Sequence, residues 1–210
     1  MKNKLKVNEI FDSIDGEGKR TGELATFIRL TGCNLRCSYC DTTYAFDEGN
    51  ERDVADIAGS VTYPNVTITG GEPLCQDIHG LIESLNGHDI NIETNGSVAI
   101  GPYMKYENVF FTIDYKCGSS GMSQAMEMKN FTMLRPRDVL KFVVGSREDL
   151  QEARKVTETY RPACAVYVSP VWGEIEPADI VDFMKEYTLT QWTVQVQLHK
   201  IIWDPAARGV

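Results

Sequence analysis

The sequence lacks the features that a membrane protein or a nucleic-acid-binding protein needs. No apolar run approaches the ~20 residues that span a bilayer, and nothing at the N-terminus is typical of a targeting segment. Acidic residues outnumber basic ones by 30 to 21, a net charge of −9, whereas a broad nucleic-acid surface requires a basic face. We therefore expect a cytoplasmic protein, with no nucleic-acid or membrane partner, that acts on a small molecule or on a protein reached by local contacts.

The chain also lacks a fourth cysteine near its conspicuous group of three. Cys33, Cys37 and Cys40 share one short loop, and the next cysteine is Cys75. Structural zinc is usually held by two spaced pairs of ligands, and no second pair follows here. With no secretory signal, disulfides are not expected. Three thiolates would leave one iron of a cubane open to an outside ligand. A structural zinc site remains the alternative, its distant fourth ligand drawn from Cys75, Cys117, Cys164, His79, His88 or His199.

Strands and helices alternate along the chain. The expected strands are 24–30, 66–69, 90–94, 109–113, 139–144, 165–168 and 193–198. The expected helices are 73–85, 147–160 with Ser146 as N-cap, and one that begins near Pro177. This order predicts parallel βα units, but the crossovers 96–108 and 118–135 look too irregular for full helices. We expect one α/β domain over residues 1–210, an incomplete (β/α) barrel of mostly parallel strands; a doubly wound open sheet is the alternative.

Polar motifs follow the expected strands at their C-terminal ends. In a barrel these ends form one mouth, where active sites lie. The motifs lie at 70–73, 93–96, 114–116, 169–170 and 197–200, and the cysteine loop adds a sixth. We therefore expect all six to converge on one site.

The spacing Cys-x3-Cys-x2-Cys, with Tyr39 before the last cysteine, resembles the signature of the radical S-adenosylmethionine enzymes. The resemblance implies a [4Fe-4S] cluster whose open iron binds the methionine moiety of S-adenosylmethionine, which reductive cleavage converts to a radical. Gly70, Gly71 and Glu72 resemble the superfamily's Gly-Gly-Glu motif. Glycines there would let backbone carbonyls approach the cofactor's ammonium group, with Glu72 as a further acceptor.

Nearly the whole chain resembles the 7-carboxy-7-deazaguanine synthase family. The matching segments are 13–18, 27–35, 40–42, 93–96, 198–200 and 208–210. The resemblance implies a carbon–nitrogen lyase that converts 6-carboxy-5,6,7,8-tetrahydropterin to 7-carboxy-7-deazaguanine with loss of ammonia, on the way to queuosine and other deazapurines. It also implies Mg²⁺, a homodimer, a reductant such as flavodoxin or ferredoxin, and a reduced, modified barrel.

The resemblance assigns roles to individual residues. Cys33, Cys37 and Cys40 would hold the cluster and Thr42 would reach Mg²⁺. The S-adenosylmethionine site would be lined by Tyr39, Asp41, Gly70, Gly71, Glu72, Gly96, Asp114, Tyr115 and Lys116. The substrate would be contacted by Ile14, Asp15, Gly16, Arg29, Thr94, His199 and Val210. Arg29 and Mg²⁺ suit the substrate carboxylate, and backbone carbonyls at 14–16 with the Val210 carboxylate suit a pterin's guanidine-like edge.

Plainer interpretations and two departures stand beside these roles. Arg29 could form a buried structural ion pair, Thr42 could cap a helix, and His199 could be a strand-end histidine. Asp15 stands where many members carry glutamine, and Asp114-Tyr115 where many carry Ser-Pro. Competing functions are a glycyl-radical activating enzyme, which shares the cysteine spacing, and a non-enzymatic zinc or iron–sulfur module.

Overall fold

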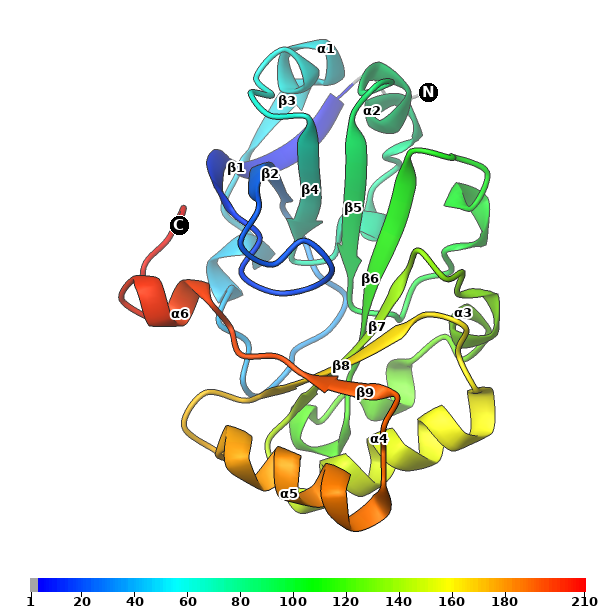
Figure 1. Ribbon diagram of the computed structural model, residues 1–210. Helices are drawn as coiled ribbons and strands as arrows, with labels where there is room; N and C mark the ends of the chain where they lie inside the picture. Colours follow the sequence, from blue (N-terminus) through cyan, green and yellow to red (C-terminus); the bar gives the residue numbers. More distant parts are fainter. Residues whose placement is uncertain (1–3) are drawn as a thin grey trace.

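The computed structural model describes residues 4–210. Nine strands form one sheet in the order β3-β1-β2-β4-β5-β6-β7-β8-β9 (Figure 1). The strands are β1 (Lys4–Ile14), β2 (Leu24–Leu30), β3 (Asn50–Asp53), β4 (Asn65–Gly70), β5 (Asp89–Thr94), β6 (Val109–Tyr115), β7 (Val139–Val144), β8 (Ala165–Pro170) and β9 (Trp192–Val194). The helices are α1 (Val54–Ala58), α2 (His79–Ser84), α3 (Lys129–Met133), α4 (Arg147–Tyr160), α5 (Pro177–Tyr187) and α6 (His199–Ile202).

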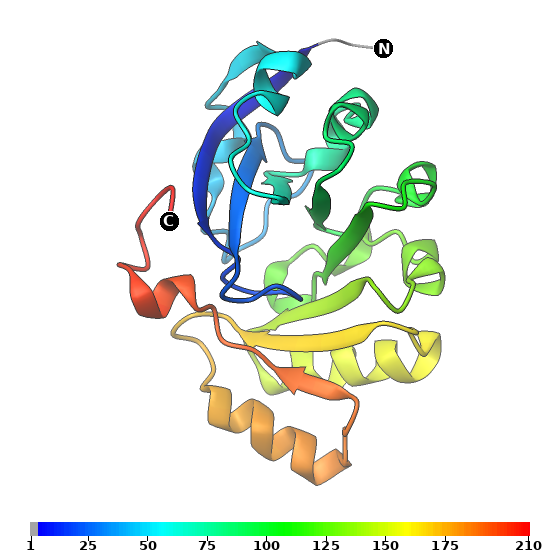
Figure 2. The ribbon, with the colours of Figure 1, turned by 45° about the horizontal axis from the view of Figure 1, so that its top comes forward.

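The sheet is an open barrel. From β2 to β9 every neighbouring pair is parallel and follows chain order, and only β1 and β3 are antiparallel. A doubly wound sheet would reverse its strand order at a switch point and place helices on both faces. Here the order never reverses in the parallel part, and α2 to α5 lie on the outer, convex side (Figure 2). The expected incomplete barrel is confirmed.

Strands β4 and β5 and the second half of β6 alternate between apolar and polar residues. Ile68, Ile92 and Phe111 are fully buried in the core, which also contains Leu81 of α2 and Leu150 of α4. The residues between them point to the concave face, because successive side chains in a strand lie on opposite faces. That face, here called the lumen, is polar, with Thr67, Asn91, Glu93, Thr112, Asp114, Lys141 and Ser169. Parallel strands are normally apolar on both faces, so the polar lumen indicates a site.

Most of the expected elements are confirmed, and β2, β7 and α4 have the expected bounds. Ser146 caps α4 by accepting a hydrogen bond from the Asp149 backbone N–H at 3.3 Å. The expected helix over 73–85 is wrong as a single element. It breaks at Gln76, whose extended backbone (ψ 156°) separates a short turn from α2. Gln76 leaves the helix because its side chain pairs with the backbone of Lys6 and Thr31.

The last expected strand, 193–198, is also wrong beyond Val194. Its alternating sequence continues, but Gln195 turns its side chain to Gly18 in the loop after β1. Leu198 then donates its backbone N–H to the Gly16 carbonyl at 2.8 Å, and α6 begins at His199. Residues 195–210, here called the closing segment, thereby leave the sheet and run beside β1, across the open side of the barrel (Figures 1 and 2).

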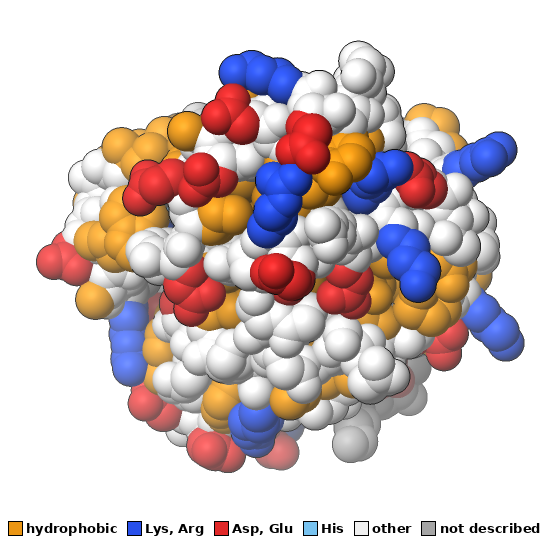
Figure 3. Space-filling model, turned by 90° about the horizontal axis from the view of Figure 1, so that it is seen from below, with side chains coloured by type: hydrophobic (Ala, Val, Ile, Leu, Met, Phe, Trp, Pro, Cys, Tyr) orange, Lys and Arg blue, Asp and Glu red, His pale blue; other side chains and the backbone are white. Residues whose placement is uncertain are grey.

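No helix within residues 4–210 combines the length and apolarity that a membrane span requires. On the face seen from below, acidic and basic side chains are interspersed and no broad basic area is present (Figure 3).

Candidate active site

The three cysteines lie on residues 31–42, here called the cluster loop, which follows β2 at the C-terminal mouth. Cys33, Cys37 and Cys40 are half-buried. The Glu72 backbone N–H donates to the Gly32 carbonyl at 2.7 Å, which fixes the loop to the end of β4. A Cβ on Gly71 would collide with the same carbonyl oxygen, and one on Gly70 with that of Leu30. The two glycines therefore bring the end of β4 directly against the cluster loop.

The three loop sulfurs are not gathered around one point. Four thiolates around one zinc at ~2.3 Å lie about 4 Å apart. Within the described part of the chain, the three loop sulfurs do not all come within 4.8 Å of one another. A cubane binds its thiolates at separate corners, so it does not require them to meet at one point. Burial raises the pKa of the Cys37 and Cys40 thiols, and the like charge of neighbouring thiolates raises it further.

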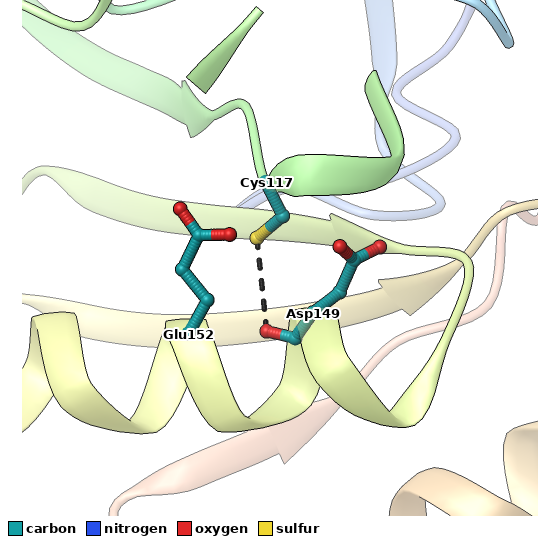
Figure 4. A group of neighbouring side chains, drawn as sticks. All are labelled: Cys117, Asp149 and Glu152. Atoms are coloured by element: carbon teal, nitrogen blue, oxygen red, sulfur yellow. Dashed lines mark hydrogen bonds between the residues drawn. The ribbon is translucent and has the colours of Figure 1, made fainter. Parts of the chain in front are cut away.

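A second group, Cys117, Asp149 and Glu152, does meet the 4.8 Å limit (Figure 4). Its carboxylates are already used by protein donors. Asp149 accepts backbone N–H groups from Ser119 at 3.0 Å and Gly145 at 2.8 Å. Glu152 accepts the Gly118 N–H and the Tyr115 hydroxyl, both at 2.9 Å. The group is therefore a support for residues 117–120 and not a metal centre.

The supported turn contacts the cluster loop. Ser38, between the second and third cysteines, donates its backbone N–H to the Ser120 carbonyl at 3.1 Å and its hydroxyl to the Ser119 carbonyl at 2.6 Å. Tyr39 reaches β7, where its hydroxyl donates to the Val143 carbonyl at 3.3 Å. Helix α4 thus holds the cluster loop indirectly, through the turn after β6.

Charged side chains of β6, β7 and the loops after β1 and β6 meet in the lumen beside the cluster loop. Asp114 lies 2.8 Å from the Lys116 ammonium and 3.0 Å from that of Lys141, which also pairs with Glu17. Burial opposes ionisation of these groups, but the opposite charges outweigh it, lowering the pKa of Asp114 and raising that of both lysines. All three remain charged. The Tyr115 side chain points to α4 instead, which leaves only its backbone for the expected cofactor site.

Glu72 and Thr94, expected at the cofactor and the substrate, contact each other. The fully buried Glu72 carboxylate accepts hydrogen bonds from the Thr94 hydroxyl at 2.8 Å, the Asn95 N–H at 2.7 Å and the Leu74 N–H at 2.9 Å. Burial raises the pKa of Glu72 to about 7, although these three donors act against the shift. Gly96 follows in a left-handed conformation (φ 76°), and a Cβ there would crowd the Asp114 carbonyl. Glu72 joins the ends of β4 and β5.

Asn95, expected at the site only as part of the motif 93–96, contacts a cluster cysteine. Its amide Nδ2 lies 3.7 Å from the Cys33 Sγ and 3.1 Å from the Asn34 side-chain oxygen. Its Oδ1 accepts the Ser97 N–H at 2.9 Å and the Ser97 hydroxyl at 2.6 Å. Those two donors fix the orientation of the amide and direct its N–H groups toward Cys33.

Thr42 makes no capping hydrogen bond to the turn that follows it, so the helix-cap interpretation has no support. Its hydroxyl instead donates to the neighbouring Asp41 carboxylate at 2.9 Å. Burial would raise the pKa of Asp41, but the Lys200 ammonium, 2.8 Å away, outweighs it and lowers the pKa to about 2. A hydroxyl and an ionised carboxylate are hard oxygen ligands of the kind Mg²⁺ takes.

The expected substrate residues fall into two groups. Arg29 and His199 lie at the mouth: Arg29 pairs with Glu9 at 2.7 Å, and the His199 ring packs so closely on Gly16 that a Cβ there would collide with it. Burial lowers the pKa of His199, although Glu17 acts against the shift. Val210 is half-buried at the end of the closing segment, after Gly209, which lies beside Glu9.

Asp15 behaves differently. Its carboxylate is only 1% exposed and pairs with Arg20 at 3.0 Å and with the Thr67 hydroxyl at 2.7 Å. Burial raises the pKa of Asp15 despite the Arg20 charge. The side chain is committed to the protein interior, so only the backbone of Ile14 to Gly16 faces a ligand, and the Gly16 carbonyl already accepts from Leu198.

Sequence reasoning missed Lys141 and gave no individual role to Glu17 and Glu93, which lay in the motifs 13–18 and 93–96. Burial raises the pKa of Glu93 to about 7, although the Lys141 charge acts against it. A signal for them was present: the strands read Ile-Asn-Ile-Glu, Phe-Thr-Ile-Asp and Leu-Lys-Phe, with a polar residue at every second position. In parallel strands covered by helices, such alternation marks residues that point into the lumen.

Comparisons with known proteins identify the relatives of this fold and site. Residues 27–120 match the model of the radical SAM superfamily. The 7-carboxy-7-deazaguanine synthase of Clostridium acetobutylicum is 43% identical, covering 98% of this chain and 99% of that protein. The enzyme of the same name from Methanospirillum hungatei is 36% identical over 96% and 86% of the two chains. The crystal structure of QueE from Escherichia coli superposes with a TM-score of 0.73 at 24% identity, covering 92% and 94%, and shows the same fold.

Proposed function

The chain belongs to the 7-carboxy-7-deazaguanine synthase family, and on that premise we propose that it converts 6-carboxy-5,6,7,8-tetrahydropterin to 7-carboxy-7-deazaguanine and ammonia. The observation that carries the proposal is the arrangement at the barrel mouth. The cluster loop follows β2, which carries Arg29, and its Asp41 pairs at 2.8 Å with Lys200, the neighbour of His199 in the closing segment. The enzyme is a radical S-adenosylmethionine lyase with a [4Fe-4S] cluster.

The chemistry divides between the cofactors and the protein. When bound, the cluster and S-adenosylmethionine supply an electron and a radical that abstracts hydrogen from the substrate. Cys33, Cys37 and Cys40 would hold the cluster, and Asp41 and Thr42 offer oxygens for Mg²⁺. Within the lumen the charges of Asp114, Lys116 and Lys141 compensate one another, which provides a fixed polar wall for a bound ligand.

The protein's own residues fix the substrate. The Arg29 guanidinium matches a carboxylate in shape and charge. His199, with a lowered pKa, is neutral near pH 7 and offers one donor and one acceptor to a pterin edge. Ring contraction removes one nitrogen as ammonia and needs no net redox change, so positioning the carbon from which hydrogen is taken is the protein's main task.

An anaerobic assay tests the proposal. The reconstituted enzyme is mixed with dithionite, S-adenosylmethionine, Mg²⁺ and 6-carboxytetrahydropterin, and the product is identified by its mass. We expect 7-carboxy-7-deazaguanine from the wild type and none from Cys37→Ala, with Cys164→Ala as the matched cysteine control. Formation of 5′-deoxyadenosine only with another substrate, or hydrogen abstraction from a partner protein, would favour the glycyl-radical activating function instead.

The family assignment also supports four finer proposals. We propose that the enzyme is a cytoplasmic homodimer, that flavodoxin or ferredoxin reduces it, and that Mg²⁺ assists the reaction. Exposed apolar residues are available for subunit contact, among them Trp172, Ile201 and Ile202. Sedimentation equilibrium measures the oligomeric state. Turnover with reduced flavodoxin in place of dithionite tests the reductant, and activity after chelation tests the role of Mg²⁺.

A further inference from the structure

Arg29 is held by one edge of its guanidinium. Its Nε donates to the Glu9 Oε1 at 2.7 Å. Within residues 4–210 this is the side chain's one hydrogen bond, so both terminal nitrogens keep their donors for a ligand. The aromatic rings of Phe11 and Tyr44 flank the guanidinium at 5.6 and 5.9 Å. Arginine binds carboxylates best through two parallel N–H groups, and this side chain presents such a pair.

Glu9 is itself held by Tyr44. The Tyr44 hydroxyl donates to the same Oε1 at 3.1 Å. Glu9 and Arg29 are register partners on β1 and β2, whereas Tyr44 comes from the turn just after the cluster loop. The turn therefore sets the position of the carboxylate that orients Arg29.

The closing segment contacts this same group. The Arg208 guanidinium lies 3.7 Å from the centre of the Tyr44 ring, and a Cβ on Gly209 would lie 3.8 Å from the Glu9 Oε2. Arg208 also pairs with Glu48 at 3.2 Å, but both side chains are more than half exposed, and exposed pairs contribute little. The stacking on Tyr44 is thus the contact that fixes Arg208 beside Glu9 and Tyr44.

We propose that Tyr44 and Arg208 are positioning residues that, through Glu9, hold Arg29 in the orientation that receives the substrate carboxylate. The proposal rests on the proposed function, which supplies that carboxylate. Docking of the closing segment on Tyr44 and binding of a carboxylated pterin are then coupled, because the ring on which Arg208 stacks also carries the hydroxyl that holds Glu9. Substrates or inhibitors that lack the carboxylate lie outside this coupling.

Two conservative variants test the coupling. Tyr44→Phe keeps the ring on which Arg208 stacks and removes the hydrogen bond to Glu9. Arg208→Gln removes the stacked cation. Each test variant has a matched control remote from the mouth. Tyr106→Phe removes a tyrosine–glutamate hydrogen bond of 3.1 Å to Glu83. Arg154→Gln removes a guanidinium that lies 4.2 Å from the centre of the Tyr187 ring.

The measured quantities are KM and kcat for 6-carboxytetrahydropterin, and the dissociation constants of 6-carboxypterin and of unsubstituted pterin. We expect each test variant to raise KM and the 6-carboxypterin constant about fivefold to tenfold, to change kcat less than twofold, and to leave the pterin constant unchanged. The controls should match the wild type. The double variant Tyr44→Phe/Arg208→Gln should weaken binding no more than the worse single variant, since Arg208 acts through Tyr44.

The outcomes separate this inference from the function itself. Equal losses for pterin and 6-carboxypterin, or unchanged binding in both folded variants, would overturn the positioning role. Additive losses in the double variant would overturn the coupling. If the wild type makes no 7-carboxy-7-deazaguanine, the proposed function fails, and the two binding constants still report whether Arg29 receives a carboxylate. Thermal unfolding of each variant identifies any variant that loses binding because it misfolds. Glu9→Gln, which keeps a hydrogen-bonding oxygen, then replaces that variant in the binding measurements.

Discussion

At the residue scale, the lumen combines groups that stay charged with a carboxyl that does not. Asp114 and Lys141 compensate each other at 3.0 Å, whereas Glu93 has no ion pair among the described residues, and burial raises its pKa to about 7. A carboxyl so placed is protonated over much of the acid range, because its charged form is poorly solvated. The stability of the protein should therefore depend on pH through this residue.

We predict that Glu93→Gln flattens the pH dependence of stability. Below pH about 4.5 both the folded and the unfolded state hold the proton. Between about 4.5 and about 7 the unfolded state loses it first, so the wild type loses stability as pH rises, by as much as about 3 kcal/mol. Urea denaturation of the apoprotein from pH 4 to 8 measures this slope. A variant with the wild-type slope would contradict the assignment; Glu158→Gln, exposed on α4, is the control.

We predict that Asn95→Leu lowers the reduction potential of the cluster. The amide N–H directed at the Cys33 Sγ, 3.7 Å away, stabilises the more negative, reduced state. A hydrogen bond worth about 1 kcal/mol corresponds to about 40 mV for a one-electron couple. An EPR-monitored redox titration without S-adenosylmethionine gives the potential. Asn108→Leu, which loses an amide bond to the His88 carbonyl far from the cluster, should leave it unchanged.

At the scale of elements, α4 supports the site from the convex side. We predict that Asp149→Ala costs about 2–3 kcal/mol of folding free energy, because two partly buried backbone N–H groups, of Ser119 and Gly145, lose a charged acceptor. The reconstituted variant should also lose iron to a chelator faster than the wild type, since residues 117–120 contact the cluster loop. Glu148→Ala, at an exposed position in the same helical turn, should change neither quantity. Equal effects of Asp149→Ala and Glu148→Ala would exclude a specific role of Asp149 in supporting residues 117–120.

Elements with a local signal could be predicted from the sequence. Helix α4 has its cap at Ser146 and an apolar period of 3.6, and β7 is apolar apart from Lys141. The end of β9 could not be predicted, because Gln195 to Leu198 alternate like a strand but find partners in the loop after β1. The partner lies far away in the sequence, and periodicity carries no information about it.

The site was predictable in its location and less so in its contacts. Parallel strands end at one mouth, so the polar motifs after β2, β4, β5 and β6 had to converge. Asp15, expected at the substrate, is turned inward by Arg20, and Arg29 is oriented by Glu9. Both outcomes depend on which charges meet in space. The plainer interpretation of Arg29 as an ion-paired residue is correct in geometry, and its free terminal nitrogens make it compatible with binding.

At the scale of the whole molecule, residues 15–22 fill the base of the lumen. Arg20 is 6% exposed and bonds to Asp15, to the Val66 carbonyl and Thr67 hydroxyl of β4, and to the Asp89 carbonyl of β5. It connects the loop to two strands. Removing one partner of a buried pair leaves an uncompensated charge.

We predict that Arg20→Ala destabilises the protein by about 3–5 kcal/mol, measured by urea denaturation at pH 7. Arg137→Ala, whose pair with Asp89 at 3.5 Å is substantially exposed, should cost less than about 1 kcal/mol. Recovery of most of the loss in Arg20→Met/Asp15→Asn would show that the unpaired Asp15 charge causes it. A small loss in Arg20→Ala alone would contradict the ion-pair account.

The hydrogen bonds between Gly18 and Gln195 join residues 177 positions apart, whereas the parallel strands pair with their successors in the chain. Local pairings pay little loop entropy and form early, and distant ones form late. We therefore expect the strands to assemble in order and the Gly18–Gln195 junction to form last. In native-state hydrogen exchange, the amides of this junction should exchange faster than those of β4 to β7. Closing of the junction is then the final step of folding and the one most easily reversed.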